Sequence, residues 1–324
     1  MILSVSRRTD IPAFYSDWFF HRLDEGYLYV INPLNRKQVS KIILNTDTVD
    51  CIVFWTKNAE PMIDRLDLLD QKGFQYYFQF TITSYQSDVE PGLEDKNSVM
   101  NSFRKLSKKI GKDKAIWRYD PIFLNEKYTL KYHELWFEAM CQRLNGYTDK
   151  CVISFLDLYT KTKRNTKELH VKELSNDDIY QIASILSNIA KKYGIQIETC
   201  SEGIDLSHYN ISNGKCIDDK LIEKIIGSKI RVNKDDTQRE ACGCVKSIDV
   251  GYYNTCKHFC KYCYANYSKA SVHENCEGYD VNSPILAGKL QGDEKITLRE
   301  MKSIRCMDST EQLEFAFVHE KGHS

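Results

Sequence analysis

Three cysteines near the end of the chain have the spacing of iron–sulfur ligands. Cys256, Cys260 and Cys263 form a C-x3-C-x2-C pattern, and Tyr262 directly precedes the last of them. Three thiolates on one loop can hold three irons of a four-iron cube, which leaves the fourth iron open to chelate the amino and carboxylate groups of a cofactor. The alternative is a zinc knuckle completed by His258 or by one more cysteine.

A second group of cysteines lies between the sixth and the seventh strand that we expect. Its members are Cys200, Cys216, Cys242 and Cys244. Four thiolates can complete the coordination of an auxiliary four-iron cluster or of a zinc ion, and free thiols are the third interpretation. The C-x-C spacing of the last two does not distinguish these alternatives.

The composition is that of an ordinary globular chain, and it limits the partners. The 324 residues are 42% hydrophobic, and 45 basic side chains balance 45 acidic ones, so the whole-chain charge does not attract nucleic acid or a membrane surface. We find neither an apolar run of about 18 residues nor a signal peptide, and we expect a cytoplasmic protein. Because the cytosol keeps thiols reduced, the twelve cysteines favour metal or iron–sulfur ligation over disulfides.

Strand-like runs alternate with helix-like segments along most of the chain. Runs rich in β-branched and aromatic residues predict seven strands: Ile2–Ser6, Cys51–Trp55, Tyr76–Ile82, Ala115–Tyr119, Val152–Leu156, Ile195–Thr199 and Val245–Val250. Capping residues and glycines punctuate the helices between them: Ser16 to Gly26, Pro61 to Gly73, and Ser175 to Gly194, with others ending near Gly111 and Gly146. This alternation predicts an α/β fold with parallel strands, namely a partial or full TIM-like (β/α) barrel whose functional residues lie at the carboxyl ends of the strands.

The cysteine loop resembles that of the radical SAM superfamily. The resemblance implies a 4Fe–4S cluster on Cys256, Cys260 and Cys263 that passes one electron to S-adenosylmethionine, which yields methionine and a 5′-deoxyadenosyl radical that takes hydrogen from a substrate. It also implies an electron donor such as flavodoxin or ferredoxin. The substrate is left open among a small molecule, a peptide and a nucleic-acid base. A non-catalytic zinc-binding barrel and an electron-transfer iron–sulfur protein are the alternatives.

The order of the weaker motifs indicates a circular permutation. Ser6–Pro12, Trp55–Asn58 with Arg65–Leu69, and Phe80–Thr83 resemble the T-D-P-Y-Q-P, T-K-S…R-D-L-D-L-L and S-I-T stretches of spore photoproduct lyase-like proteins, in the order of that family. Only the first strand and its cysteine loop have moved to the end, so we expect Val245–Val250 to pair in parallel beside Ile2–Ser6. The whole chain also resembles a prokaryotic group of proteins of unassigned function that share Ser-Arg-Arg-Thr-Asp and Cys-Gly-Cys-Val-Lys-Ser.

Charged residues at the strand ends are expected to face one mouth of the barrel. Basic side chains there suit the carboxylate of S-adenosylmethionine, and acidic ones suit its ammonium or ribose. With the resemblance placing the residue before the last cysteine near the adenine, the expected cofactor contacts are Tyr262, Asp10, Lys57, Arg8, Arg118 and Glu198. The competing interpretation of the charged residues is that they form buried ion pairs that orient loops.

We expect two parts along the chain. Residues 1–270 would form the permuted barrel, with a cysteine-rich insertion at about 200–244, and residues 271–324 would form a tail that wraps the barrel and carries a helix-like piece over Thr297–Ile304. The 20 tyrosines and 14 phenylalanines are expected mainly in the core and the strands, since no signature of a nucleic-acid-binding module is present.

Overall fold

One parallel sheet forms the centre of the protein. The structure is a computed structural model and describes residues 1–306. Eight strands pair in the order β10-β1-β4-β5-β6-β7-β8-β9, and every pairing is parallel. Their bounds are β1 Ile2–Val5, β4 Cys51–Thr56, β5 Tyr76–Thr81, β6 Ala115–Ile122, β7 Lys150–Phe155, β8 Gln196–Cys200, β9 Ser212–Gly214 and β10 Ile248–Asp249. The expected parallel α/β architecture is therefore confirmed. In residues 1–306 no ladder joins β9 to β10, so the sheet is open there rather than a closed barrel.

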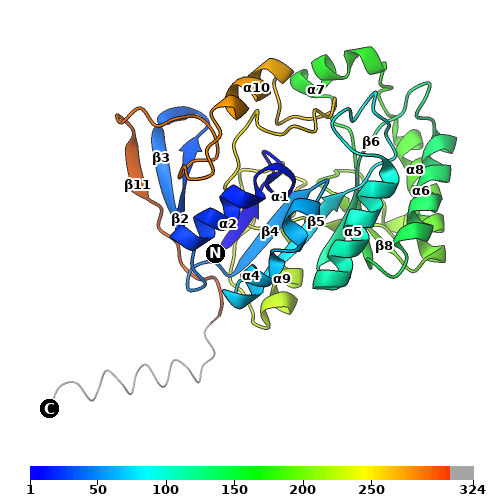
Figure 1. The fold of residues 1–324 in the computed structure, drawn as a ribbon. Helices are drawn as coiled ribbons and strands as arrows, with labels where there is room; N and C mark the ends of the chain where they lie inside the picture. Colours follow the sequence, from blue (N-terminus) through cyan, green and yellow to red (C-terminus); the bar gives the residue numbers. More distant parts are fainter. Residues whose placement is uncertain (307–324) are drawn as a thin grey trace.

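Helices follow most of the strands, as the alternating pattern predicted (Figure 1). The α-helices are α1 Ile11–Phe14, α2 Ser16–Glu25, α3 Glu60–Ile63, α4 Leu66–Gln71, α5 Lys96–Ile110, α6 Leu130–Leu144, α7 Thr160–Asn165, α8 Asn176–Lys192, α9 Asp219–Ile226 and α10 Lys269–Glu277, with short 3-10 turns at Lys167–Leu169 and Ser207–Tyr209. The helix expected from Pro61 to Gly73 is broken into α3 and α4. Ser175 caps α8 through a capping box with Asp178, whereas Ser16 is the first residue of α2 rather than its cap. None of the described helices is both long and apolar enough to cross a membrane.

The two faces of the sheet have different covers. Alternate residues such as Phe54, Phe78 and Trp117 face the helices and form the larger core cluster. Their neighbours Val53 and Tyr77 face the other way and pack against the segment that carries the second cysteine group, together with α9. The face of the sheet opposite the larger core cluster, which we call the interior face, is thus covered by residues from about 216 to 245. This segment lies close to the position of the expected insertion.

The pairing of the last strand with the first is confirmed. Leu3 is opposite Ile248 and Ser4 is opposite Asp249, in parallel. The Asp249 carboxylate reinforces this pairing because it accepts hydrogen bonds from the hydroxyls of Ser4 and Ser6 at 2.8 and 2.7 Å. Strand β10 is shorter than the expected run, but the pairing brings the start of the cysteine loop beside the end of β1.

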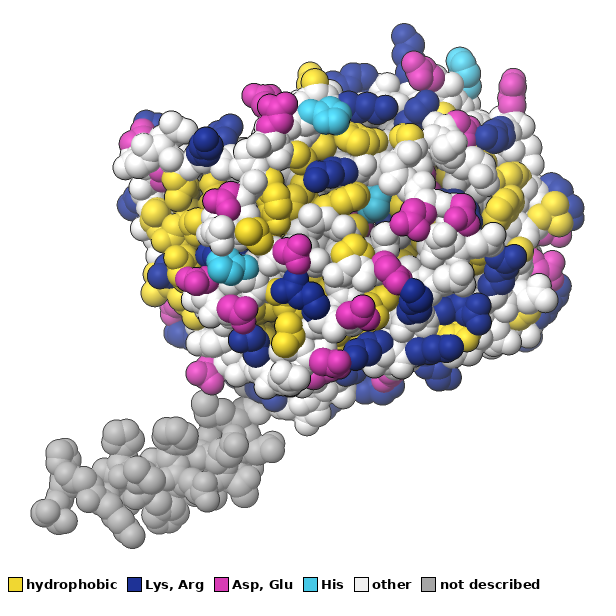
Figure 2. Space-filling model, in the orientation of Figure 1, with side chains coloured by type: hydrophobic (Ala, Val, Ile, Leu, Met, Phe, Trp, Pro, Cys, Tyr) yellow, Lys and Arg dark blue, Asp and Glu magenta, His cyan; other side chains and the backbone are white. Residues whose placement is uncertain are grey.

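A small second sheet was not foreseen. Strands β2 Tyr27–Asn32 and β3 Asn35–Ile43 form an antiparallel hairpin, and β11 Lys295–Leu298 adds to β3 in parallel. The helix expected over Thr297–Ile304 is wrong, because its start belongs to β11 and residues 299–304 have no regular structure. The backbone of this segment bonds to β3 instead of to itself. The expected tail beyond residue 306 lies outside the described residues. On the face in Figure 2, charged side chains of both signs are interspersed.

Candidate functional site

Both cysteine groups meet in one cavity. Its volume is about 530 Å³, and it is lined by the segments that follow the carboxyl ends of β1, β4, β6, β7 and β8. All seven predicted ligand cysteines line it, namely Cys200, Cys216, Cys242, Cys244, Cys256, Cys260 and Cys263. The sequence separated these residues by as many as 63 positions, so the fold itself creates the site.

A hydrogen-bonded pair joins the cysteine loop to the first strand. His258, which lies between the first two cysteines of the loop, bonds through Nε2 to Oδ2 of Asp10 at 2.8 Å, and both side chains are buried. The Asp10 carboxylate also accepts hydrogen bonds from the Thr56 hydroxyl, from the Lys57 amide and from the Ala13 amide, at 2.7 to 3.0 Å. Asp10 therefore connects the ends of β1 and β4 with the cysteine loop, and its oxygens are fully used.

The segment after β5 supports the loop from the other side. The Lys261 amide donates to the Val89 carbonyl at 2.9 Å, and the Gly92 amide donates to the His258 carbonyl at 3.0 Å. A side chain at Gly92 would collide with the loop, since its Cβ would lie 2.5 Å from the Lys257 carbonyl oxygen. Only glycine allows the two backbones to approach this closely.

A buried carboxylate fixes the residue before the last cysteine. The Tyr262 hydroxyl donates to Glu90, which is also paired with Lys57 at 2.8 Å and with Lys96. Burial alone would raise the pKa of Glu90, but the two ammonium groups lower it to about 2. The cluster holds two cations and one anion, so one net positive charge remains beside the cavity wall.

The three thiols of the loop are protonated in the absence of a bound cation. Burial raises the pKa of Cys256 and Cys263, and it raises that of Cys260 to about 12, because a thiolate would lose its hydration there. The Cys263 sulfur accepts a hydrogen bond from the Ala265 amide at 3.3 Å. A group of half-buried thiolates at this place requires a positive charge, which metal ions supply.

Two sulfurs of the second group are in direct contact. The sulfurs of Cys200 and Cys216 are 2.9 Å apart, and the Cys244 sulfur accepts a hydrogen bond from the Ile217 amide at 3.4 Å. The neighbouring thiols lower the pKa of Cys244, and the interaction with Cys244 raises that of Cys242. The four residues come from β8, from the segment before α9 and from the segment before β10, so this group is assembled only by the fold.

Arg118 belongs to this second group. Its Nη1 donates to the Cys216 sulfur at 2.6 Å, its other terminal nitrogen pairs with Asp120, and its guanidinium lies over the Trp55 ring at 5.2 Å from the ring centre. The side chain is 5% exposed, so this cation is a permanent neighbour of the thiols.

As the atoms stand, no group of three or more His, Cys, Asp or Glu side chains in residues 1–306 is arranged to hold a metal ion. In a tetrahedral site with metal–sulfur bonds of about 2.3 Å, the sulfurs lie about 3.8 Å apart. Cys200 and Cys216 are closer than this, so they would have to separate by about 1 Å to share an ion.

The remaining expected cofactor contacts divide into two classes. Arg8 lines the cavity, where it lies over the Tyr253 ring at 5.2 Å and reaches Asp249 at 3.7 Å. Glu198 is not among the cavity residues, because it pairs with Lys150 at 2.8 Å. This pairing matches the competing interpretation of strand-end charges.

Several supporting residues were missed by sequence reasoning. Glu90 and Gly92 contact the cysteine loop, and Asp249 joins β10 to β1, but none of the three belongs to a recognisable motif. His258 was considered only as a zinc ligand, and its place inside the C-x3-C spacing was the one available signal.

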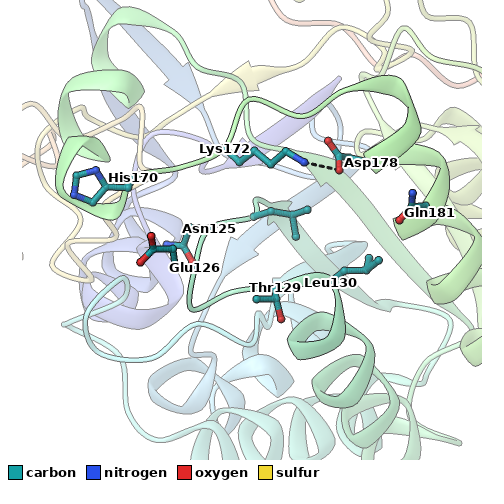
Figure 3. A pocket seen from close by; sticks show the side chains of 9 residues that line it. Asn125, Glu126, Thr129, Leu130, His170, Lys172, Asp178 and Gln181 are labelled. Carbon is teal, nitrogen blue, oxygen red and sulfur yellow. Dashed lines mark hydrogen bonds and ion pairs between the residues drawn. The ribbon is translucent and has the colours of Figure 1, made fainter.

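A second hollow of about 460 Å³ lies between the segment that precedes α6 and the start of α8 (Figure 3). It contains no cysteine, and its Lys172 is engaged by Asp178 at 2.7 Å. It therefore offers nothing to the thiol chemistry of the first cavity.

Comparison with known proteins assigns a family but no activity. No curated protein matches the chain. One similar solved structure is described as a putative alpha-L-fucosidase from Bacteroides thetaiotaomicron VPI-5482. It is 10% identical over 55% of this chain and 84% of its own, with a TM-score of 0.26, which supports no functional argument. The family model described as "Domain of unknown function (DUF1848)" matches residues 2–265, and the chain belongs to that family.

Proposed function

We propose that the protein is a radical SAM enzyme whose substrate enters the cavity shared by the two cysteine groups. One observation carries the proposal. The C-x3-C-x2-C loop lies at the carboxyl ends of parallel strands, where enzymes of this architecture bind their ligands, and all three of its sulfurs line the cavity.

The donor set of the loop fits a four-iron cluster. Cys256, Cys260 and Cys263 would hold three irons, and the raised pKa of these half-buried thiols means that positive charge from the irons is needed for them to bind as thiolates. When bound, the cluster and S-adenosylmethionine supply an electron and a carbon radical that abstracts hydrogen from a substrate.

The chain's own residues would bind the cofactor and hold the cysteine loop in position. The net positive cluster of Lys57, Lys96 and Glu90 would attract the carboxylate of the cofactor, and Tyr262 is held in place by Glu90. Asp10 has no free oxygen, so we assign it to positioning the loop through His258 rather than to contacting the cofactor.

The second group is proposed to hold an auxiliary four-iron cluster. Its four thiols suit a closed coordination shell, and Arg118 offsets part of the negative charge that four thiolates bring. A four-cysteine zinc site is the alternative for this group alone.

The pairing of β10 with β1 supports a circular permutation of the barrel. It puts the C-terminal cysteine loop beside the segments that resemble the second and third strands of the lyase-like family. A circular permutation is physically tolerable in a domain whose chain termini lie close together at the surface.

Metal analysis followed by a product assay tests the proposal. Anaerobically purified protein should carry about eight irons, and the reconstituted protein should form 5′-deoxyadenosine from S-adenosylmethionine and dithionite. Stoichiometric zinc without iron would refute the enzyme and support a zinc-binding module. Eight irons without 5′-deoxyadenosine would instead support an electron carrier.

A further inference from the structure

Two segments at the mouth of the cavity are basic in a chain whose overall charge is zero. Residues 158–167 and 250–273 contain no Asp or Glu. Together they carry seven Lys and Arg residues, namely Lys161, Lys163, Arg164, Lys167, Lys257, Lys261 and Lys269. The first segment contains α7, and the second runs through the cysteine loop into α10. Along the upper edge of Figure 2, where Figure 1 places these two helices, dark blue side chains are visible with magenta ones among them.

The two segments contact each other, so they form one surface. Arg164 donates to the Tyr267 carbonyl at 2.8 Å and lies over the Tyr267 ring at 4.3 Å. Asn165 donates to the Cys263 carbonyl at 3.4 Å, which joins the helix to the cysteine loop. We call residues 158–167 and 250–273 the rim.

Most cations of the rim have no acidic partner. Lys261 meets Glu168 at 3.4 Å, and the other six form no ion pair within residues 1–306. Inside the cavity the opposite holds, because Lys57, Arg118 and Arg239 each have a carboxylate. Unpaired cations on a surface attract an anionic partner.

Exposed tyrosines are interleaved with these cations. Tyr159, Tyr264 and Tyr267 are 53%, 52% and 55% exposed. The first two also line the cavity, so their rings stand where the cavity meets the solvent. Aromatic faces next to cations fit a ligand with both flat rings and negative charges.

We propose that the rim binds single-stranded nucleic acid and presents one of its bases to the cavity. Phosphates would contact Lys161, Lys163 and Lys167, and bases would stack on Tyr159 and Tyr267. This inference rests on the proposed function, since the same cavity receives the reacting group. The cavity of about 530 Å³ would also receive the cofactor, so no more than one residue of a polymer could enter it and the rest would lie on the rim. An acidic peptide would match the cations but not the tyrosine faces.

The test measures binding of a fluorescein-labelled 20-nucleotide oligo-dT to the reconstituted protein, by anisotropy at several salt concentrations. The triple variant Lys161→Ala/Lys163→Ala/Lys167→Ala should bind more weakly, and its salt slope should fall by about 2, because each phosphate contact on a single strand contributes about 0.7. The matched control removes three exposed lysines from α6 and α8, as Lys131→Ala/Lys191→Ala/Lys192→Ala, and should keep the wild-type slope.

Stacking is tested separately from charge. Tyr159→Ala and Tyr267→Ala should each weaken binding about tenfold, while the phenylalanine variants should retain it because the ring face remains. The proposal would be overturned if both triple lysine variants lost the same affinity for oligo-dT. It would also be overturned if the tyrosine-to-alanine variants bound oligo-dT as tightly as the wild type does. Competition by poly-glutamate equal to that by oligo-dT would assign the rim to an acidic polypeptide instead. If the protein forms 5′-deoxyadenosine but does not bind oligo-dT, this inference is refuted and the proposed function stands. If the protein binds oligo-dT but contains no iron, the proposed function is refuted and the rim remains a nucleic-acid-binding surface.

Discussion

The two cysteine groups share a cavity but are built in different ways. Cys256, Cys260 and Cys263 come from one loop of eight residues, and other parts of the protein hold that loop through His258 and Tyr262. The second group is assembled from three distant segments, and two of its sulfurs, those of Cys200 and Cys216, are 2.9 Å apart. A local spacing can therefore be recognised in a sequence, whereas an assembled site becomes evident only in the fold.

Their surroundings differ in charge as well. Beside the loop, Glu90 is flanked by two lysines, which leaves a net positive charge. Beside the second group, Arg118 is the cation in contact with sulfur, while Asp120, Asp157 and Glu202 lie nearby. We interpret the surroundings of the loop as a place that binds an anionic group of the cofactor. We interpret the second group as a site with complete coordination, where Arg118 offsets part of the charge of the thiolates.

The largest expected effect separates the two groups by activity. Replacing Cys256, Cys260 or Cys263 singly with Ala should abolish formation of 5′-deoxyadenosine, because only a three-cysteine cluster leaves an iron open to the cofactor. Replacing Cys242 or Cys244 should spare part of the cleavage seen without substrate. The product is quantified by chromatography after reconstitution of each variant with dithionite and cofactor.

The reverse result would exchange the assignments. Full cleavage by the Cys256→Ala variant, with none by Cys242→Ala, would mean that the assembled group binds the cofactor. Cys141→Ala is the matched control, since this cysteine is buried in α6, outside the cavity.

A smaller effect is expected from Arg118. Replacing it with Gln removes the cation that contacts Cys216, so four thiolates there would become more costly to bury. We expect the variant to lose about half of its iron, from about eight to about four per chain, and to keep uncoupled cleavage. Iron analysis with the 5′-deoxyadenosine assay measures both. Loss of all iron would mean that Arg118 supports the whole fold rather than one group.

Much of the framework could be predicted, because it depends on local patterns. The buried strand runs, the capping box at Ser175 and the C-x3-C-x2-C spacing are each contained in a few consecutive residues. The predicted pairing of the last strand with the first is the exception. It is a long-range contact that came from the order of motifs, and the structure confirms it.

What was missed depends on contacts between distant segments. Strand β11 forms because β3 offers a free edge. The local sequence does not reveal this distant edge, and it therefore suggested a helix from Thr297. Arg118 was expected near a strand end, as Lys57 was, but it lies inside β6, where residues 216–244 pack against the interior face of the sheet and bring the Cys216 sulfur to it. The charge and spacing of these residues do not encode which of them meets a thiol.

A still smaller effect is expected from the hydrogen bond between His258 and Asp10, which holds the cysteine loop. His258→Ala should slow formation of 5′-deoxyadenosine several-fold and raise the KM for the cofactor, because the loop loses its bond to Asp10. His258→Gln can still donate to the carboxylate and should recover part of both values. A change in protein stability alone, with unaltered KM, would contradict a positioning role.

The smallest effect tests the charge difference through pH. Burial, with a contribution from Asp157, raises the pKa of Glu202 from 4.5 to about 7, whereas Glu90 lies at about 2. Glu202 holds its proton more tightly in the folded state, so the free energy of unfolding should fall as pH rises from 4.5 to 7. Glu90 acts in the opposite way, since its contribution is present above pH 4.5 and is lost as pH falls toward 2.

Urea denaturation of the reduced apoprotein at pH 5 and pH 8 measures these opposite signs. At pH 8 the folded state holds an ionised, mostly buried Glu202, and Glu202→Gln removes that cost, so the variant should be more stable than the wild type by about 1–2 kcal/mol. At pH 5 the wild-type side chain is protonated in the folded state, and the two proteins should differ little. Glu90→Gln, the matched variant, should be less stable than the wild type at both values, because Lys57 and Lys96 would face each other without their carboxylate. If Glu202→Gln is destabilised at pH 8, a cation holds Glu202 ionised, and the two cysteine groups do not differ in charge as we infer.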